Sequence, residues 1–402
     1  MKEAVNVSIG DVVKIIGGGT PVRSRSDYYG GDIPWVTPKD MKSWEIKSSQ
    51  IAITQLGLDS STARVAPADS VLIVVRSGVL KHTVPVGINR IPVAINQDMK
   101  ALICSESILP DYLARLIKAL SGTILKWVRA TTADNFPIER LRDLQVALPH
   151  VDKQRRIVNV LNQADALRAK RWAAIALLDD LTQSIFLDMF GDPVANERGW
   201  NRVRFEDLLE GIDSGKSPTC LDRPAAEGEW GVLKLGAVTS CRFKPEENKA
   251  LPTAIAPVAK HEVRPGDLLF SRKNTRELVA ACALVGETPP QMLLPDLIFR
   301  FNFKSDAPVD KRYIQQLLVN RHKRRKVQEL ASGSAGSMPN ISKTRLLGLD
   351  IELPPLELQQ QFSKRVRAVE ESRRTHQASL RVLDDLFGSL QQRAFRGELW
   401  DD

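Results

Sequence analysis

The chain has 402 residues, of which 43% are hydrophobic and 26% are charged, which is ordinary for a globular protein of two or three domains. Lys and Arg number 57 against 48 Asp and Glu, and the net charge of +9 favours a polyanionic partner. The longest strongly apolar run, residues 71–75, is far shorter than the ~20 residues of a membrane-spanning helix. Because the N-terminus also lacks the apolar stretch of a secretion signal, we predict a cytoplasmic protein.

The first 150 residues predict a mixed α and β domain. β-branched residues, Pro and Gly are frequent there, and short apolar runs such as 71–75 predict strands joined by turns, for example at 29–32. Residues 111–129 predict a helix. We therefore place a first domain at 1–150.

A long helix is predicted after this domain. Residues 151–189 contain no Pro or Gly and are rich in Ala, Leu, Arg, Lys, Gln and Asp. Gly191-Asp192-Pro193 then ends the helix, so the helical segment spans 151–192.

The second half of the chain follows the same order. Residues 193–353 predict a second mixed domain, with a turn at 264–267, a strand at 267–270 and a helix at 310–330. Residues 354–402 form a second helical segment, in which the predicted helix runs from 356 to about 395.

An internal repeat relates the two halves. When the chain is shifted by 205 residues, LRDLQVALP at 141–149 aligns with LLGLDIELP at 346–354, and the alignment continues through the helices without a gap. Gln154 falls on Gln359, and Asn135 falls on Asn340. A repeat of this length is too long for a solenoid unit, so it predicts a duplicated module of a globular segment followed by a long helix.

The two long helices carry a pattern typical of helix pairing. Heptad positions counted from Ile157 are apolar at eight of nine places, which predicts a seam against another helix. The exception, Arg171, corresponds to His376, so we predict a polar layer that sets the register; the alternative is that each helix packs on its own domain. The predicted pairing residues are Ile157, Val160, Leu167, Leu178, Leu181 and Ile185 in the first helix, and Phe362, Val369, Leu383, Leu386 and Leu390 in the second.

Catalytic and metal-binding patterns do not emerge from the sequence. Three residues separate Gly211 from Gly215, one fewer than a phosphate-binding P-loop needs, and the glycine run at 17–19 lacks the third glycine of a dinucleotide fingerprint. The four cysteines form no C-x-x-C pair and the five histidines show no ligand spacing, so we predict no metal and no disulfide scaffold. A self-sufficient methyltransferase or nuclease is disfavoured because its catalytic motifs are missing, and we predict a non-catalytic chain.

Three sets of motifs carry a resemblance to a known family. The first is GGGTP at 17–21 with YYGGDIPWVTPKDM at 28–41; the second is the pair of segments 148–157 and 353–360, which enter the long helices; the third is FLDMFGDP at 186–193 with AFRGEL at 394–399, which leave them. In this order, over nearly the whole chain, they resemble the specificity subunit of a type I restriction–modification system. The second half departs from the family at Ser217-Pro218, where a Thr-Pro is usual, and at residues 220–229.

The resemblance implies a non-catalytic reader of double-stranded DNA. Its fold would be α+β, with two target-recognition domains separated by a long antiparallel two-helix coiled coil and related by a pseudo-twofold repeat. Each recognition domain would bind one half of a bipartite, asymmetric target. Two adenine-N6 methyltransferase subunits and motor-nuclease subunits would be the partners, and S-adenosylmethionine, ATP and Mg²⁺ would belong to those partners, with no cofactor in this chain.

The coiled coil has the dimensions of a ruler between two DNA half-sites. About 30 paired residues at ~1.5 Å rise span about 45 Å, compared with ~34–36 Å for one turn of DNA. We therefore expect the length of the helices to set the spacer between the half-sites.

Polar residues near turns and strand ends are the candidates for DNA contact. Arg and Lys read guanine, Asn and Gln read adenine, and other cations contact phosphate without discrimination. For each residue the alternative is a solvated surface charge, and for the whole chain it is a stand-alone two-domain DNA-binding regulator. The candidates are Arg23, Arg25, Lys39, Arg76 and His82 in the first domain, Lys216, Arg272, Lys273, Asn274 and Arg276 in the second, and Arg324 and Arg325 for phosphate.

Charged residues of the long helices are the candidates for partner docking. We expect Arg168, Lys170, Arg171, Arg365, Arg367 and Arg373 on the outer faces, where a quasi-twofold repeat would offer two similar surfaces to two copies of one partner.

Overall fold

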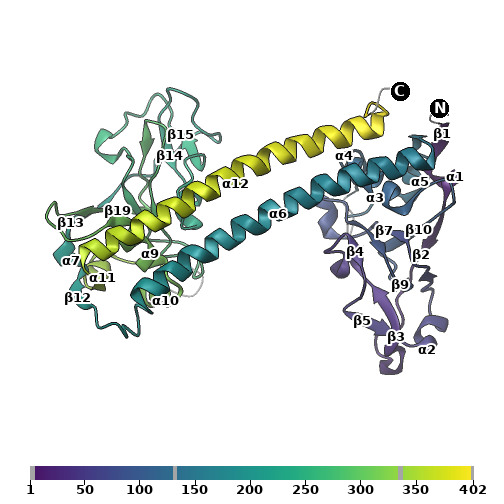
Figure 1. Ribbon diagram of the computed structural model, residues 1–402, viewed down its shortest axis with the longest axis horizontal. Helices are drawn as coiled ribbons and strands as arrows, with labels where there is room; N and C mark the ends of the chain where they lie inside the picture. Colours follow the sequence, from purple (N-terminus) through teal and green to yellow (C-terminus); the bar gives the residue numbers. More distant parts are fainter. Residues whose placement is uncertain (1–4, 130–133, 334–337, 400–402) are drawn as a thin grey trace. The chain divides into compact units, whose positions relative to one another are not determined.

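A computed structural model describes residues 5–129, 134–333 and 338–399. The chain divides into two compact units, and each contains strands, short helices and parts of both long helices (Figure 1). Unit 1 comprises Met1–Trp172 and Ala378–Asp402, and unit 2 comprises Ala173–Gln377. The predicted mixed α and β fold is confirmed in both units.

Unit 1 is built on two β-sheets and a short strand pair. Its larger sheet has the strand order β2-β10-β7-β8-β4, its second sheet has the order β5-β3-β9-β6, and β1 pairs with β11. The strands are β1 (Val5–Ser8), β2 (Val13–Gly17), β3 (Tyr29–Val36), β4 (Glu45–Ile46), β5 (Ile51–Ile53), β6 (Val65–Ala66), β7 (Ser70–Val74), β8 (Val86–Asn89), β9 (Val93–Ile95), β10 (Met99–Cys104) and β11 (Gln145–Leu148).

The core of unit 1 lies between the larger sheet and helix α3 (Pro110–Ala119). All five residues of β7 are buried, which confirms the strand predicted at 71–75. Helix α3 buries Tyr112, Leu113 and Ile117 against this sheet. The predicted helix 111–129 instead ends near Leu120, where α4 (Ser121–Leu125) begins with Ser and Gly, two poor helix formers. The remaining helices are α1 (Ile9–Val12), α2 (Gln55–Asp59) and α5 (Ile138–Arg142).

Unit 2 repeats the four-strand order of the larger sheet. Its main sheet is β13-β19-β16-β17, beside a three-stranded sheet β15-β14-β18 and a pair β12-β20. The strands are β12 (Asn201–Arg204), β13 (Leu209–Ser214), β14 (Gly231–Leu233), β15 (Asn248–Ala250), β16 (Leu268–Ser271), β17 (Cys282–Leu284), β18 (Met292–Leu293), β19 (Ile298–Phe303) and β20 (Asp350–Leu353). Its short helices are α7 (Phe205–Leu208), α8 (Gly236–Thr239), α9 (Lys311–Val319), α10 (Arg321–Glu329) and α11 (Lys343–Leu347).

The single helix predicted at 310–330 is interrupted at Asn320. The backbone of Asn320 is extended in ψ (134°), and its side chain accepts hydrogen bonds from the amides of His322 and Lys323. This is the geometry of a helix N-cap, so Asn320 ends α9 and begins α10.

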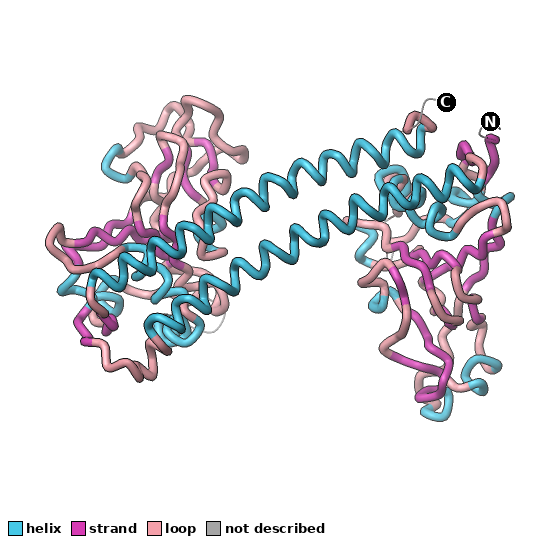
Figure 2. The backbone as a smooth tube through the Cα atoms, in the orientation of Figure 1, coloured by secondary structure: helices cyan, strands magenta, loops and turns pink. Residues whose placement is uncertain are grey.

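The two long helices are unbroken, as Figure 2 shows. Helix α6 (Val151–Phe190, 40 residues) and helix α12 (Leu356–Arg396, 41 residues) match the predicted helical segments. Within unit 1, Arg168 Nε of α6 donates to Asp384 Oδ1 of α12 at 2.6 Å. Within unit 2, Arg373 Nε of α12 donates to Asp179 Oδ1 of α6 at 2.9 Å. These two ion pairs are related by the 205-residue shift, since Arg168 corresponds to Arg373 and Asp179 to Asp384.

The buried faces of the helices differ from the predicted seam in register. Ile157 and Phe362 are buried as expected, at 1% and 0% exposure, and Val369 is buried at 9%. The predicted positions Leu167, Leu181 and Leu386 are wrong, because these side chains are 50%, 43% and 47% exposed. Val160, Leu178, Ile185, Leu383 and Leu390 are half-buried.

The correction has a simple cause. After Ile157 the buried face continues at Leu161, four residues later, where the prediction took Val160, three residues later. Steps of three and of four residues both place an apolar residue at most helical turns. The number of apolar residues therefore could not decide between the two registers. Further along the helix, Arg168 lies on this face instead of the predicted Leu167. Its guanidinium can lie there because Asp165 and Asp384 neutralise its charge. Arg168 and Arg373 therefore lie between the helices and not on their outer faces.

Candidate nucleic-acid interface

Backbone hydrogen bonds gather three turns of unit 1 at one place. The amide of Val75, just after β7, donates to Asp98 O in the turn between β9 and β10 at 2.9 Å. The amide of Ser77 donates to Asp134 O at 2.9 Å, and that of Phe136 donates to Val75 O at 3.2 Å. Three segments far apart in sequence are thereby brought to the ends of the strands.

Polar side chains lie on these turns and form what we call the unit 1 loop cluster: Thr20, Arg76, Gln97 and Asp98. Arg76 Nε forms an ion pair with Asp98 Oδ1 at 2.5 Å, while its side chain remains 48% exposed. The Thr20 hydroxyl contacts the exposed amide of Gln97. The cluster therefore presents a guanidinium and an amide, two groups that can read base edges.

Unit 2 builds the same crossing from equivalent segments. The amide of Arg272 donates to Leu297 O at 3.1 Å, that of Asn274 donates to Pro339 O at 3.3 Å, and that of Ile341 donates to Arg272 O at 2.8 Å. The unit 2 loop cluster comprises Ser217, Arg272, Lys273, Asp296 and Asn340. In it the Ser217 hydroxyl contacts the Asp296 carboxylate, as Thr20 contacts Gln97 in unit 1.

The side chains of the unit 2 loop cluster are held more firmly. Arg272 Nε donates to Asn340 Oδ1 at 3.0 Å, and the guanidinium lies 4.9 Å from the centre of the Phe299 ring. Lys273 is half-exposed, and Asn274 is only 6% exposed. Lys216, next to Ser217, is exposed. The loop residues predicted at 272–274 thus meet Asn340, the residue that the 205-residue repeat pairs with Asn135.

Glycines allow the chain to reach both clusters. A Cβ atom on Gly18 would overlap the carbonyl oxygen of Ile95, and one on Gly215 would overlap that of Leu294. Only glycine fits such a close backbone approach. The glycines in the segments 17–19 and 211–215 therefore let the backbone pass close to another segment, and this close passage brings Thr20 and Ser217 to the turns.

The other predicted contacts of unit 1 lie outside the loop cluster. Arg23 is exposed before the short turn of helix at Ser26–Tyr28, and Lys39 is exposed at Pro38–Asp40. Arg25 forms an ion pair with Asp27 at 2.7 Å and stacks on the ring of Tyr28. His82 is exposed at the end of the short turn Gly78–Lys81. Their roles in DNA binding stay predictions.

The basic run 321–326 does not form a single cationic patch. Lys323 points inward and forms a buried ion pair with Glu352 at 2.6 Å, with the two side chains 6% and 3% exposed. His322 contacts the carboxylate of Asp192. Arg324 donates to the carbonyls of Glu277, Leu278 and Val279 at 3.2 to 3.4 Å, so it anchors the loop that carries the exposed Arg276.

Arg325 keeps the role predicted for this run. Its side chain is exposed on α10, whereas the guanidinium of Arg324 is committed to the loop carbonyls. The phosphate contacts predicted for Arg324 and Arg325 stay predictions, and of the two side chains only that of Arg325 is exposed.

Two buried glutamines connect the long helices to the domains. Gln154 is fully buried in unit 1, where its Oε1 accepts from the amide of Leu109 at 2.9 Å and its Nε2 donates to Ser107 O at 2.8 Å. Gln359 is fully buried in unit 2, where its Oε1 accepts from the amide of Asp310 at 2.9 Å and its Nε2 donates to Pro308 O at 3.1 Å. Each helix start is thereby tied to the segment that begins α3 or α9.

Large apolar side chains remain exposed on the long helices. Trp172 and Val382 in unit 1 are 60% and 67% exposed, and Leu177 in unit 2 is 68% exposed. Single exposed apolar residues are ordinary on protein surfaces.

Metal-binding and reactive groups are not evident in the described part of the chain. Among residues 5–129, 134–333 and 338–399, no group of three His, Cys, Asp or Glu side chains could hold a metal ion. No described helix is long and apolar enough to cross a membrane. Burial raises the pKa of the Cys104 thiol to about 12 and raises that of Cys282 well above its ordinary value, which disfavours the thiolate form of both.

Comparison with known proteins shows what the chain is similar to. Residues 1–176 match the model of the type I restriction modification DNA specificity domain. Two Escherichia coli proteins are similar to this chain. The type I restriction enzyme EcoR124I/EcoR124II specificity subunit is 34% identical over 163 residues, which cover 40% of each chain. The type I restriction enzyme EcoEI specificity subunit is 36% identical over 163 residues, which cover 40% of this chain and 27% of the relative. The chain is thus similar to specificity subunits of type I restriction–modification systems, and the match to the domain model lies in its first 176 residues.

Other specificity subunits extend the similarity. The MjaIX specificity subunit of Methanocaldococcus jannaschii is 26% identical over 234 residues, covering 52% of each chain. These matches span about half or less of the relatives' own length. Among solved structures, the type I S subunit of M. genitalium aligns over 97% of this chain and 96% of its own, with a TM-score of 0.58 and 12% identity, so it shares the fold. A chain from a structural study of type I R-M complex assembly aligns over 99% of both chains with a TM-score of 0.58 and 17% identity.

Proposed function

We propose that this chain is the non-catalytic DNA-reading subunit of a cytoplasmic type I restriction–modification enzyme. Each unit reads one half of a bipartite, asymmetric double-stranded DNA target. Adenine-N6 methyltransferase subunits and motor-nuclease subunits carry out the chemistry and bring S-adenosylmethionine, ATP and Mg²⁺. The similarity of residues 1–176 to the type I DNA specificity domain, and of the chain to type I specificity subunits, supports this division of labour.

One observation carries the bipartite proposal: the two units build the same loop crossing with different side chains. Gln97 in unit 1 corresponds to Asp296 in unit 2, each contacting a hydroxyl from the preceding glycine-rich segment. An amide suits adenine, whereas a carboxylate accepts from the amino group of cytosine. Two equivalent positions with different hydrogen-bonding groups are what an asymmetric target requires.

Methylome sequencing of a host that expresses the chain with its methyltransferase subunit tests this proposal. We expect Gln97→Ala to relax base preference in one half-site and Asp296→Ala to relax it in the other, each by about 1–3 kcal/mol of discrimination. Arg325→Glu is the matched control, because loss of a phosphate contact weakens binding to all sequences and reduces the salt dependence by about one counterion. If either loop variant changed both half-sites, the assignment of one half-site to each unit would be wrong.

We infer further that α6 and α12 form an antiparallel coiled coil that separates the two recognition domains. The ion pairs Arg168–Asp384 and Arg373–Asp179 support this pairing and its internal repeat. Inserting one helical turn of about four residues into both helices should change the spacer while preserving both half-sites. An unchanged spacer in the methylome would contradict the role of the helices as a ruler.

The exposed apolar residues of the helices support docking of the methyltransferase subunits there. Trp172→Ala should reduce co-purification of the methyltransferase subunit without lowering the thermal stability of the chain alone, since its ring is 60% exposed. A stand-alone DNA-binding regulator is the second candidate function. Tight specific DNA binding by the purified chain, with no effect of the methyltransferase subunit on affinity, would favour the regulator.

A further inference from the structure

An exposed arginine lies on the loop that joins β16 to β17 in unit 2. We call residues 272–280 the unit 2 hairpin loop. The loop begins with Arg272 and Lys273 of the unit 2 loop cluster, and the side chain of Arg276 is exposed three residues after Lys273. Arg276 is therefore part of the same short loop as two side chains of the candidate nucleic-acid interface.

Two side chains of α10 hold the backbone of this loop, and we call them the α10 clamp. Arg324 Nη2 lies 3.2 to 3.4 Å from the carbonyl oxygens of residues 277–279. Gln328 Nε2 lies 3.1 to 3.2 Å from the carbonyl oxygens of Arg276, Glu277 and Val279. Residues four apart lie on one face of a helix, so the two amino groups act on the loop together.

Helix α10 is itself fixed to the body of unit 2. Lys323 forms its buried ion pair with Glu352 of β20, and Val327 is fully buried in the core. Arg324 Nη1 also lies 3.3 Å from the Sγ atom of Cys241, in the turn after α8. Because the supports of the clamp are packed, the position of the loop backbone is set by the core of unit 2.

Unit 1 supports the corresponding loop, residues 75–85 between β7 and β8, in another way. This loop folds into the short helix Gly78–Lys81, whose Leu80 is buried at 1% exposure, and Lys118 of α3 donates to Thr83 Oγ1 at 3.2 Å near its end. Helix α4, which follows α3 as α10 follows α9, has five residues and contains neither Arg nor Gln.

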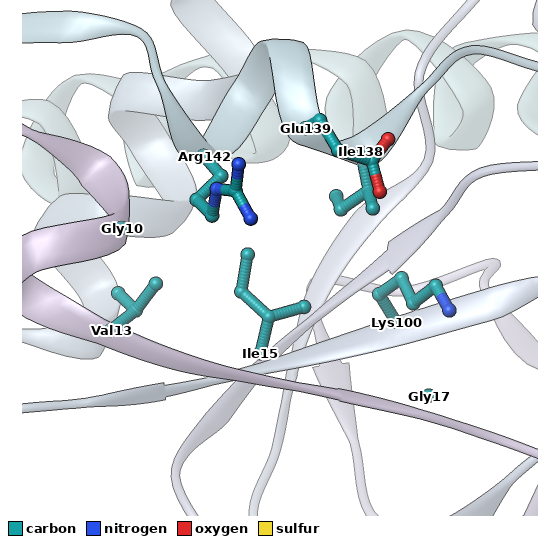
Figure 3. Close-up of a pocket in the computed structure, with 8 residues that line it drawn as sticks. All are labelled: Gly10, Val13, Ile15, Gly17, Lys100, Ile138, Glu139 and Arg142. Carbon is teal, nitrogen blue, oxygen red and sulfur yellow. The ribbon is translucent and has the colours of Figure 1, made fainter.

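The cavity of unit 1 does not replace the clamp. It has a volume of about 330 Å³ and lies between residues of β2 and α5, as Figure 3 shows, and the residues that line it include none of the loop 75–85. Among the described residues, a clamp on the loop carbonyls is therefore seen in unit 2 and not in unit 1. A part present in one unit suits a role in one half-site better than a role in the common fold.

We propose that Arg324 and Gln328 are positioning residues that fix Arg276 to read a guanine in the half-site of unit 2. This inference rests on the proposed DNA-reading function. A bidentate contact to the O6 and N7 atoms of guanine needs a guanidinium in one orientation, whereas a phosphate contact does not discriminate between bases. Fixing the backbone of Arg276 before binding reduces the entropy that is lost when the side chain is ordered on DNA.

Hydrogen exchange of the full chain and methylome sequencing test the proposal on the same variants. Gln328→Met removes the amide donors with little change in side-chain length and none in charge. We expect the amides of Leu278 and Val279, which donate to Thr275 O, to exchange about tenfold faster in this variant. Preference for guanine at one position of the unit 2 half-site should fall about five- to tenfold. Gln55→Met removes an exposed hydrogen bond to Asp59 and is the control, which should match the wild type.

A double-mutant cycle separates positioning from a structural role. Arg276→Ala should relax preference at the same base position. Gln328→Met should add no further relaxation in the Arg276→Ala chain, because the clamp acts through that side chain. Arg324→Lys retains the charge but lacks the planar fork of a guanidinium, so it should change exchange and base preference in the same direction as Gln328→Met.

Three results would overturn the proposal: unchanged exchange in Gln328→Met, faster exchange with unchanged preference in the unit 2 half-site, or additive effects of Arg276→Ala and Gln328→Met. Loss of methylation at both half-sites together with a lower melting temperature would also overturn it, since the clamp would then only stabilise the fold. Failure of the proposed function is seen separately, because Asp296→Ala would then leave the preference in both half-sites unchanged.

Discussion

The same positions of the repeat are built with opposite chemistry in the two units. At the start of α6, Ile157 packs in the largely aliphatic core of unit 1. Its equivalent in α12, Phe362, packs in unit 2 against the rings of Phe186 and Phe190, with centroids 5.7 and 5.3 Å away.

The ion pairs beside the long helices are also built with different partners. In unit 1 Arg168 pairs with two carboxylates, Asp165 and Asp384, and Asp165 also pairs with Arg115. In unit 2 one carboxylate, Asp179, serves two arginines, Arg242 and Arg373. At both positions compared, the two units keep a buried side chain or a paired charge, although different residues provide it.

The largest effect should come from the aromatic cluster of unit 2. Phe362→Ala removes a fully buried ring and should lower the free energy of unfolding by about 3–5 kcal/mol, because the cavity cannot collapse among the remaining rings. Phe362→Leu nearly conserves volume and should cost below about 1.5 kcal/mol. Urea unfolding measures both, and hydrogen exchange should report the loss in β13 and β19 more than in β2 and β10. A cost for Phe362→Ala below that of Phe362→Leu would contradict the packing account.

The ion pairs of Asp179 and Asp384 predict smaller losses of unfolding free energy, and the two losses should differ. Asp179→Asn leaves two arginines without their shared carboxylate and should cost about 1–2 kcal/mol, reduced from a buried value because the Asp179 side chain is 41% exposed. Asp384→Asn should cost below about 1 kcal/mol, since Arg168 keeps its bond to Asp165. Urea unfolding of the two single variants gives the comparison. Equal costs would show that the number of partners at each carboxylate does not matter.

The smallest expected effect is the pH dependence of the unfolding free energy that comes from the Asp213–Arg300 ion pair. Burial raises the pKa of Asp213, but hydrogen bonds from Arg300 and Asn302 and the charges of Arg300 and Lys343 outweigh it and depress the pKa overall. A depressed pKa contributes stability above the unfolded value of about 3.9, and this stability is lost as pH falls through the folded pKa.

The difference in unfolding free energy between wild type and Asp213→Asn should therefore be largest near neutral pH and shrink in acid. We expect it to stay below about 1 kcal/mol, because the Asp213 side chain is 44% exposed. Unfolding curves from pH 7 down to about 3 measure it. A difference that grew on acidification would contradict the pairing in unit 2.

Local sequence patterns predicted the elements but not their charged contacts. The apolar run 71–75, the segment without Pro or Gly at 151–189 and the segment of helical composition at 356–395 contain enough information to give β7, α6 and α12. The inward turn of Lys323 depends on Glu352, and the position of Arg168 between the helices depends on Asp384, 216 residues away. Such partners come from the tertiary fold, so both residues looked like surface charges in the sequence.

The residues of the candidate nucleic-acid interface were likewise only partly predictable from the sequence. Arg76 and Arg272 could be proposed because cations after a buried strand are visible in the sequence. Gln97 and Asp296 could not, because their relation appears only when Thr20 and Ser217 are brought to the turns by the glycine crossings. The aligned pair Asn135 and Asn340 was a further signal in the sequence that pointed to these loops.

The division of each long helix between the units has a consequence for biosynthesis. Unit 1 begins with the first strand of the chain but includes residues 378–402, and Ala394 of α12 is 3% exposed in its core. The ribosome must therefore pass the whole of unit 2 before the N-terminal domain receives its last packing element. Until then, nascent unit 1 exposes the apolar surface that Ala394 and Phe395 later cover, so we expect it to need protection from aggregation during translation.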